Sequence, residues 1–199
     1  MRLLYSAASP FARKVCVLLL ETTQEDIAVT PVAAHPIDGD AILNAAAPLG
    51  KIPALEREDG PTLFDSRVIC RYLDNRAQAG LYPLARLWDV LTIEALADGI
   101  MDAAVLSVYE KRVRPEPMWH QPWLDAQRSK IIRALDALEQ QWISHLHGPL
   151  HMGQIAVACA LGYLDFRHGA MDWRNSHDNL AAWHARFADR PSMVQTIPV

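Results

Sequence analysis

The first stretch of the chain that could do chemistry is Ser9-Pro10-Phe11-Ala12, where a short apolar run gives way to the helical pattern of residues 11–20. Proline fits the first turn of a helix and serine is a favoured N-cap residue, so the Ser9 hydroxyl is expected among unpaired backbone N–H groups. Such a position can hold an anion. A plain helix cap accounts for Ser9 equally well when the tetrapeptide is taken alone.

These four residues are similar in spacing to the C-P-x-C redox turn of thioredoxins and glutaredoxins, with Ser9 and Ala12 in place of the two cysteines. A dithiol cannot operate at this turn. What remains is a hydroxyl that can donate a hydrogen bond to a thiolate supplied by a ligand, beside the positive end of a helix dipole. The turn therefore indicates a thiol co-substrate rather than a protein nucleophile.

Two further stretches offer polar groups where an element begins. Residues 48–55 lead from a loop into a predicted strand, where a cis peptide bond before Pro53 would turn the Ile52 backbone outward to pair with an extended peptide. A proline here could equally protect a free sheet edge. Asp65 and Ser66 begin a predicted helix and form a polar nest for a carboxylate and an amine, with ordinary capping as the alternative.

Composition limits the possible functions. The 199 residues are 51% hydrophobic and 21% charged with a net charge of −4, and no basic stripe indicates a nucleic-acid partner. No stretch approaches the length of a membrane span. The three cysteines are far apart in apolar helical patterns, which is typical of buried thiols in the cytoplasm. His145, His147 and His151 straddle a Gly-Pro break, so no metal site is expected.

Short strand-like runs alternate with helical segments up to about residue 80, and only helical segments follow. This change predicts an α/β domain over residues 1–78 and an all-helical domain over residues 85–199. The α/β part has the order βαβαββα, and long helical periods follow it. The predicted strands are residues 3–5, 27–32, 52–56 and 62–64; the predicted helices are residues 11–22, 39–46, 65–75, 84–113, 123–147, 152–168 and 178–188.

In this order and spacing, the motifs resemble the glutathione transferase family over essentially the whole chain, most closely a bacterial serine-type branch. The resemblance is carried by S-P-F-x-R-K-V from residue 9, P-L-G-K-I-P-x-L from residue 48, F-D-S-x-x-I-x-x-Y-L from residue 64 and I-A-V-A-C-A-L-G-Y-L-D-F-R from residue 155. It implies a thioredoxin-like glutathione domain joined to a helical domain, usually in a homodimer, with glutathione as co-substrate and no metal.

The resemblance also implies roles for single residues. Ser9 would hydrogen-bond the glutathione sulfur and be the catalytic group. Ile52, before the cis-proline candidate Pro53, would pair with the cysteinyl backbone of glutathione. Asp65 and Ser66 would hold the γ-glutamyl end.

Further contacts are expected around these. Phe11 would lie beside the ligand, and Lys51 or His35 would supply a cation for the glycyl carboxylate. Against a partner subunit, Arg67 and Arg71 could pair with acids such as Glu94 or Asp98, or could simply face solvent. The electrophile would lie in the cleft between the domains, against Met101, Val105, Leu106 and Tyr109, most of which could equally be core.

The predicted function is therefore conjugation of glutathione to a small apolar electrophile. A free thiol has a pKa of about 8.5, and a helix N-terminus with a hydroxyl donor would lower it by roughly one or two units. One alternative is a non-catalytic binding or regulatory protein that keeps the fold. The other is a glutathione-dependent reductase or peroxidase, which is disfavoured because neither position 9 nor position 12 is cysteine.

Overall fold

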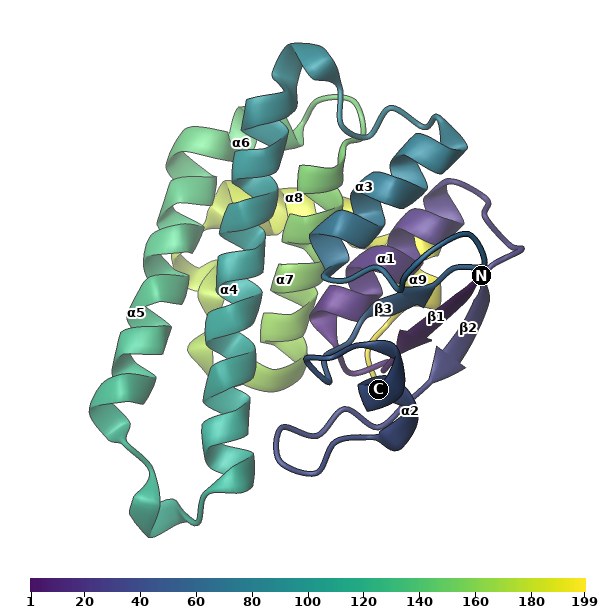
Figure 1. Cartoon of the computed structure of the whole chain (residues 1–199). Coiled ribbons are helices and arrows are strands. Elements are labelled where there is room, and N and C mark those ends of the chain that lie inside the picture. Colours follow the sequence, from purple (N-terminus) through teal and green to yellow (C-terminus); the bar gives the residue numbers. More distant parts are fainter. The chain divides into compact units, whose positions relative to one another are not determined.

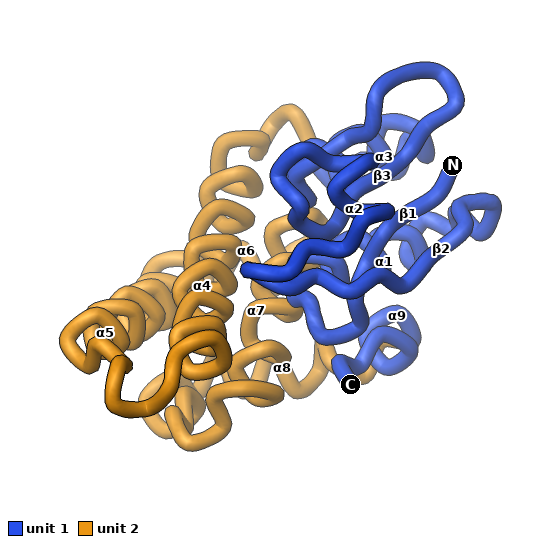
Figure 2. Tube along the Cα trace, turned by 60° about the horizontal axis from the view of Figure 1, so that its bottom comes forward, with its two compact units in different colours: residues 1–82, 191–199 blue, residues 83–190 orange.

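The structure is a computed structural model that describes residues 1–199, and the chain folds into two compact units (Figure 2). The first unit comprises residues 1–82 and 191–199, and the second comprises residues 83–190. No helix in the chain combines the length and apolar character needed to cross a membrane. Each unit is described by itself.

The first unit is built on a small mixed sheet in the order β2-β1-β3. The central strand pairs in parallel with β2 and antiparallel with β3, and its residues Leu3 and Leu4 are fully buried. Successive side chains of a strand face opposite sides of the sheet, so the two leucines fill the core on both faces. The strands are β1 (Arg2–Tyr5), β2 (Ala28–Pro31) and β3 (Ala54–Glu56).

Helices complete this unit and confirm the predicted thioredoxin-like arrangement. Helices α1 and α3 pack against each other (Figure 1). Helix α2 contributes Leu43 to a buried cluster with Leu4 and Ala54 of the sheet. The helices are α1 (Pro10–Glu21), α2 (Ala41–Ala46), α3 (Ser66–Ala77) and α9 (Pro191–Gln195).

The predicted fourth strand, residues 62–64, is reduced to a single antiparallel pair. Leu55 and Leu63 exchange two backbone hydrogen bonds of 2.9 Å each, and no further pairing follows. Pro61 has no N–H to donate on one side, and Asp65 already caps α3 on the other. The chain between them is too short to extend the ladder.

The C-terminal segment, residues 191–199, belongs to the first unit, whereas the sequence analysis assigned it to the helical domain. Helix α9 packs on α1. The Arg13 guanidinium, only 8% exposed, donates to the Met193 carbonyl at 3.0 Å and to the Thr196 hydroxyl at 3.3 Å. A buried arginine needs such acceptors, and the last residues of the chain supply them.

The second unit is all-helical, as predicted. Two of its helices have the predicted bounds, whereas predicted helix 123–147 is divided by a π-helical turn, Leu138–Trp142, and predicted helix 84–113 begins with a 3-10 turn, Leu84–Arg86. Further 3-10 turns are Glu116–Met118, Gly169–Met171 and Trp173–Ser176. The α-helices are α4 (Leu87–Val113), α5 (Gln121–Ala137), α6 (Ile143–Leu146), α7 (Met152–His168) and α8 (Asp178–Ala188).

Helix α7 is the core of the second unit and lies beside α4 (Figure 1). Near the starts of both helices the backbones approach closely, because a Cβ added at Gly153 would lie 2.9 Å from Cγ2 of Ile93. At the end of α7, Nε2 of His168 lies 3.0 Å from the Ala104 carbonyl oxygen, which accepts its hydrogen bond. The two helices therefore run in the same direction, and α4 continues beyond this contact to Val113.

Candidate functional site

Ser9 is the N-cap of α1, as the sequence predicts. Its backbone is extended (φ −88°, ψ 121°), and its Oγ accepts a hydrogen bond from the Ala12 N–H at 3.2 Å. Pro10 takes the first helical position, and the Phe11 N–H precedes any possible acceptor inside the helix. The Ser9 hydroxyl proton is left to donate, so the helix start offers an anion both an O–H and an unpaired N–H group.

Two cations follow Ser9 within two turns of α1. Arg13 is 8% exposed and Lys14 is fully buried, and the first turn of the helix contains no acid. The Arg13 guanidinium is bound by the C-terminal segment, whereas the charge of Lys14 acts on Asp65 and helps to lower its pKa.

Asp65 and Ser66 begin α3, also as predicted. Asp65 is the N-cap: Oδ1 accepts the Arg67 N–H at 3.0 Å and Oδ2 pairs with the Arg67 guanidinium at 2.8 Å. Partial burial raises the pKa of Asp65, but the hydrogen bonds from Arg67 and the charges of Arg67 and Lys14 outweigh it and leave the pKa lowered. Asp65 therefore remains a carboxylate that can take an amine, and the backbone of Ser66, a residue only 2% exposed, starts the helix.

The predicted cis peptide bond before Pro53 is present. Sheet pairing begins one residue later, with Ala54 opposite Leu4, so the Ile52 backbone lies outside the ladder and can pair with a ligand. The register also sets Pro53 beside the end of β1, from which the chain runs directly to α1. The cis-proline loop and the start of α1 therefore lie at the same end of the sheet.

The remaining predicted glutathione contacts are His35, Lys51 and Phe11, and they differ in exposure and in hydrogen bonding. Nδ1 of His35 lies 3.3 Å from the Ile37 nitrogen and 3.1 Å from the Asp38 nitrogen, both of which donate to it. The same ring nitrogen lies 3.8 Å from Oδ2 of Asp38. Lys51 is exposed and forms no ion pair, so it can supply the charge, and Phe11 is half-buried in the first turn of α1.

The predicted electrophile residues all lie on α4, but they do not form one surface. Met101 is fully buried and Leu106 is 43% exposed. Val105 and Tyr109 are half-buried and follow Met101 at intervals of four residues, so these three share one stripe of the helix. Met101 is a core residue here, and the accessible predicted residues are Val105 and Tyr109 on this stripe and Leu106 outside it.

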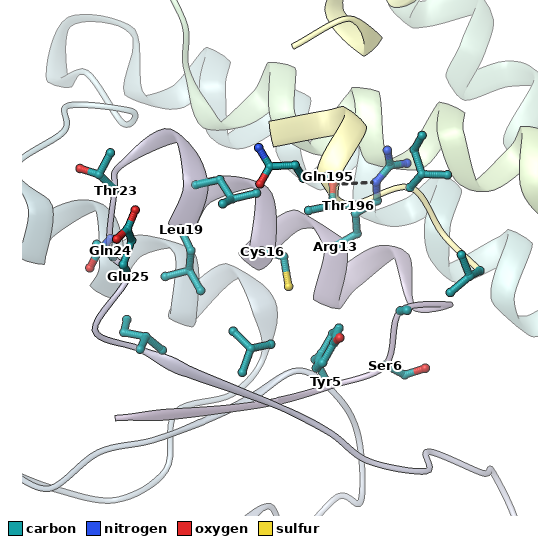
Figure 3. A pocket seen from close by; sticks show the side chains of 16 residues that line it. Tyr5, Ser6, Arg13, Cys16, Leu19, Thr23, Gln24, Glu25, Gln195 and Thr196 are labelled. Atoms are coloured by element: carbon teal, nitrogen blue, oxygen red, sulfur yellow. Dashed lines mark hydrogen bonds between the residues drawn. The ribbon is translucent and has the colours of Figure 1, made fainter. Parts of the chain in front are cut away.

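The first unit also contains a groove of about 620 Å³ that none of the predicted glutathione contacts lines. Figure 3 shows it between α1, the strands and the C-terminal segment, with the Cys16 sulfur directed into it. Its lining is mainly apolar: Tyr5, Ser6, Ala7, Arg13, Cys16, Leu19, Leu20, Thr23, Gln24, Glu25, Ile27, Val29, Gln195, Thr196, Ile197 and Val199.

No group of three or more His, Cys, Asp or Glu side chains is gathered to hold a metal ion. The three cysteines form no disulfide bond; Cys70 and Cys159 are buried, and Cys16 is only half-buried, in contrast to the prediction.

Both parts of the chain match models of one family. Residues 8–76 match "Glutathione S-transferase, N-terminal domain", and residues 121–186 match "Glutathione S-transferase, C-terminal domain". The chain belongs to the glutathione S-transferase family. Its fold is accordingly the glutathione transferase fold, with a thioredoxin-like domain and a helical domain, as the sequence motifs indicated.

Similar members of the glutathione transferase family are known from several bacteria. An "uncharacterized GST-like protein YibF" of Escherichia coli K12 is 39% identical, over 100% of this chain and 98% of that protein. A glutathione transferase family member from Pseudomonas fluorescens Pf-5 with bound glutathione has a TM-score of 0.97 and 48% identity, over 100% of this chain and 98% of that one. A second structure from Pseudomonas fluorescens Pf-5, with bound S-(propanoic acid)-glutathione, has a TM-score of 0.92 and 45% identity over the whole of both chains.

The ion pairs expected across a glutathione transferase dimer are not available in the predicted form. Glu94 and Asp98 are 1% and 6% exposed, so neither carboxylate is at the surface for a partner's arginine. Arg67 pairs with Asp65, and the Arg71 guanidinium lies 4.7 Å from the centre of the Tyr82 ring. These two arginines have functions within their own unit.

Proposed function

We propose that this chain is a serine-type glutathione S-transferase, which binds glutathione and conjugates it to a small electrophile in the cytoplasm as a homodimer. The observation that carries the proposal is the Ser9 hydroxyl at the N-terminus of α1, with one hydrogen bond accepted from Ala12 and its own proton available. Glutathione bound to the Pseudomonas fluorescens relative supports glutathione as the thiol.

In this proposal glutathione is bound by backbone hydrogen bonds and by ion pairs. The Ile52 N–H and C=O pair with the cysteinyl residue of glutathione. The Asp65 carboxylate takes the γ-glutamyl ammonium, while Ser66 at the start of α3 donates to the γ-glutamyl carboxylate. Lys51 neutralises the glycyl carboxylate. Lys51 and Asp65 are exposed, and the Ile52 backbone lies outside the sheet ladder.

Ser9 acts on the thiol without serving as a base. The thiol proton goes to solvent, and the remaining thiolate accepts hydrogen bonds from the Ser9 hydroxyl and the start of α1, which lower the thiol pKa. The sulfur then forms an S–C bond with the electrophile. Either a leaving group departs with its bonding electron pair, or the π electrons of an activated alkene shift onto its conjugated group and water returns a proton.

The electrophile lies along α4 in this proposal, at Val105, Leu106 and Tyr109, with Met101 behind them in the core. The bound S-(propanoic acid)-glutathione of the relative is a glutathione carrying a carbon substituent on sulfur, which is the class of product that conjugation gives. A dithiol reductase is not favoured, because the turn at α1 has Ser9 and Ala12 where the two cysteines would stand.

The test is a pH titration of glutathione bound to the wild type, read from the ultraviolet absorbance of the thiolate. We expect an apparent thiol pKa on the order of one to two units below the free value of about 8.5. Conjugation of activated aryl halides and alkenes is then assayed on the same preparation. Glutathione that binds with a normal pKa and is not conjugated would instead indicate a binding or regulatory protein. Sedimentation at micromolar protein checks the dimer.

A further inference from the structure

The groove of about 620 Å³ in the first unit has the size of a small-molecule site. Ligand pockets have volumes of roughly 300–1,000 Å³ and are mostly apolar. One wall is helix α1, where Arg13, Cys16 and Leu20 follow one another at intervals of three and four residues and so share one stripe of the helix. Strand β2 and the C-terminal segment supply other walls (Figure 3). All of the lining residues belong to the first unit, so this hollow is complete within one unit.

The apolar part of this groove is open to solvent. Leu20 of α1, Val29 of β2 and Ile197 of the C-terminal segment all line it, and they are 39%, 44% and 60% exposed. Deeper in the same lining, Leu19 and Ile27 are buried. Exposed apolar side chains that gather around a hollow are typical of a surface that binds an apolar molecule.

Arg13 brings a positive charge to this apolar lining. The residue is only 8% exposed and forms no ion pair, because Nε and Nη2 donate to two neutral acceptors, the Thr196 hydroxyl and the Met193 carbonyl. Nη1 has no partner in the protein, yet it is not sealed from solvent, since the fully buried side-chain polar atom without a partner is Nδ1 of His151. A buried cation is costly without a counter-charge. The guanidinium therefore keeps donors available for an anion.

No carboxylate of the lining offsets the charge of Arg13. The acidic side chain in the lining is Glu25, and Figure 3 shows it at the opposite end of the groove from Arg13. A ligand that complements the groove therefore has an anionic group at Arg13 and an apolar body that lies along α1 towards Leu20.

We propose that this groove binds a small monocarboxylic acid with an apolar body, whose carboxylate pairs with Arg13. A guanidinium group matches the two oxygens of a carboxylate, and the apolar body covers Leu20, Val29 and Ile197. None of the predicted glutathione contacts lines the groove, so this site is additional to the proposed transferase site and does not depend on it. Because Arg13 also contacts residues 191–199, a bound acid would strengthen the docking of that segment.

The first test compares octanoate, 1-octanol and octylammonium by isothermal titration calorimetry on the full chain. The three probes have the same apolar chain and differ in the charge of the head group. Charge-assisted hydrogen bonds predict that octanoate binds about tenfold more tightly than octanol, and that octylammonium binds more weakly than either. Saturating glutathione should leave the affinity for octanoate unchanged. Displacement of octanoate by glutathione would place the acid in the glutathione site and overturn the proposal.

Cys16 reports whether the groove is occupied, because Cys70 and Cys159 are fully buried. N-ethylmaleimide is a neutral thiol reagent, and mass spectrometry measures the rate at which it modifies Cys16. Saturating octanoate should slow this modification several-fold, whereas octylammonium at the same concentration should not. A rate that octanoate does not change would overturn the placement of the ligand in the groove.

Two variants test the contacts. Arg13→Gln should reduce the affinity for octanoate to that for octanol, and the affinity for octanol should stay the same. Val29→Glu leaves the anchor of the C-terminal segment intact and places a negative charge at the exposed rim, so it should weaken octanoate binding several-fold. Ala28→Glu is the matched control, because Ala28 is also exposed on β2 but does not line the groove, and successive side chains of a strand face opposite sides of the sheet.

Four results would overturn the proposal. The first two are wild-type protein that does not bind octanoate, or that binds it no more tightly than octanol. The third is octanoate binding that survives both Arg13→Gln and Val29→Glu. The fourth is equal weakening by Val29→Glu and Ala28→Glu, which would show a general effect of charge rather than a contact in the groove.

Discussion

The Ser9 hydroxyl oxygen accepts the backbone N–H of Ala12 at 3.2 Å, so one side chain has two functions. As an N-cap it stabilises α1, and as a donor it can hold the thiolate that the proposed reaction needs. The accepted bond polarises the hydroxyl, which makes its proton a better donor. Mutations can separate these two functions because glycine and alanine differ as N-caps.

Ser9→Gly should abolish most conjugation while leaving the fold intact. Glycine costs only a few tenths of a kcal/mol at an N-cap, whereas alanine costs about 1 kcal/mol. We therefore expect Ser9→Gly and Ser9→Ala to lose kcat/KM equally, by at least about tenfold, and only Ser9→Ala to be clearly destabilised in urea. Ser9→Thr keeps the hydroxyl and is the control. If Ser9→Gly retains full activity, the hydroxyl serves only as a cap.

Asp65→Asn should weaken glutathione binding without destabilising α3. Asparagine caps a helix as well as aspartate, and the exposed ion pair between Asp65 and Arg67 contributes little to stability. The loss of the negative charge removes the partner of the γ-glutamyl ammonium, and we expect the Kd to rise about tenfold. Calorimetry and thermal unfolding measure the two effects separately. Unchanged affinity would mean that the carboxylate only caps the helix.

The helix caps and helix bounds that the sequence predicted correctly depend on local rules. Ser9 and Asp65 could be predicted as N-caps because the preference for such residues depends only on the few residues around the start of a helix. The bounds of α7 and α8 were also predicted correctly, because in both helices a helical pattern of apolar residues ends at a glycine or a polar residue. In these segments the packing follows the local pattern.

The parts that were not predicted depend on contacts between distant residues. Lys14 is fully buried and Arg13 nearly so, yet a charged pair in a helix reads as a solvated break in the apolar pattern. The acceptors that allow Arg13 to be buried come from Met193 and Thr196, at the other end of the chain. No local pattern indicates such a pairing, so the docking of residues 191–199 on the first unit could not be predicted.

The stability of the protein should fall as the pH drops below about 6.5, in part because of His151. Burial lowers the pKa of this histidine, which is 1% exposed; its bond to the His145 carbonyl opposes the shift, and the charges of Arg86 and His145 add to it. At a pH below about 6.5, which is the pKa of histidine in the unfolded chain, the unfolded state binds a proton more readily than the folded state does. Protonation therefore favours unfolding.

His151→Gln removes this group and should flatten the pH dependence of the free energy of unfolding between about pH 7 and pH 5. Urea unfolding at several pH values measures it, and His147→Gln at an exposed neighbouring position is the matched control. His168 contributes in the same direction, since burial also lowers its pKa, so the dependence should weaken rather than vanish. An identical slope in His151→Gln and wild type would contradict the prediction.

The C-terminal segment should stabilise α1, the helix that carries Ser9 at its start. Arg13 binds the Met193 carbonyl and the Thr196 hydroxyl near one end of α1, and Ser192 donates to Glu21 at the other. Arg13→Met keeps the apolar stem but leaves the Met193 carbonyl without this donor, which should cost about 1–3 kcal/mol of unfolding free energy. Thr196→Val removes the bond from Arg13 to Thr196 and the bond that the Thr196 hydroxyl donates to the Ser192 carbonyl, but it keeps Arg13 bonded to the Met193 carbonyl and should cost less. Equal stability of Arg13→Met and wild type in urea would show that the helix holds its position without this contact. A loss of kcat/KM in Arg13→Met, measured below its unfolding midpoint, would show that the contact also sets the position of Ser9.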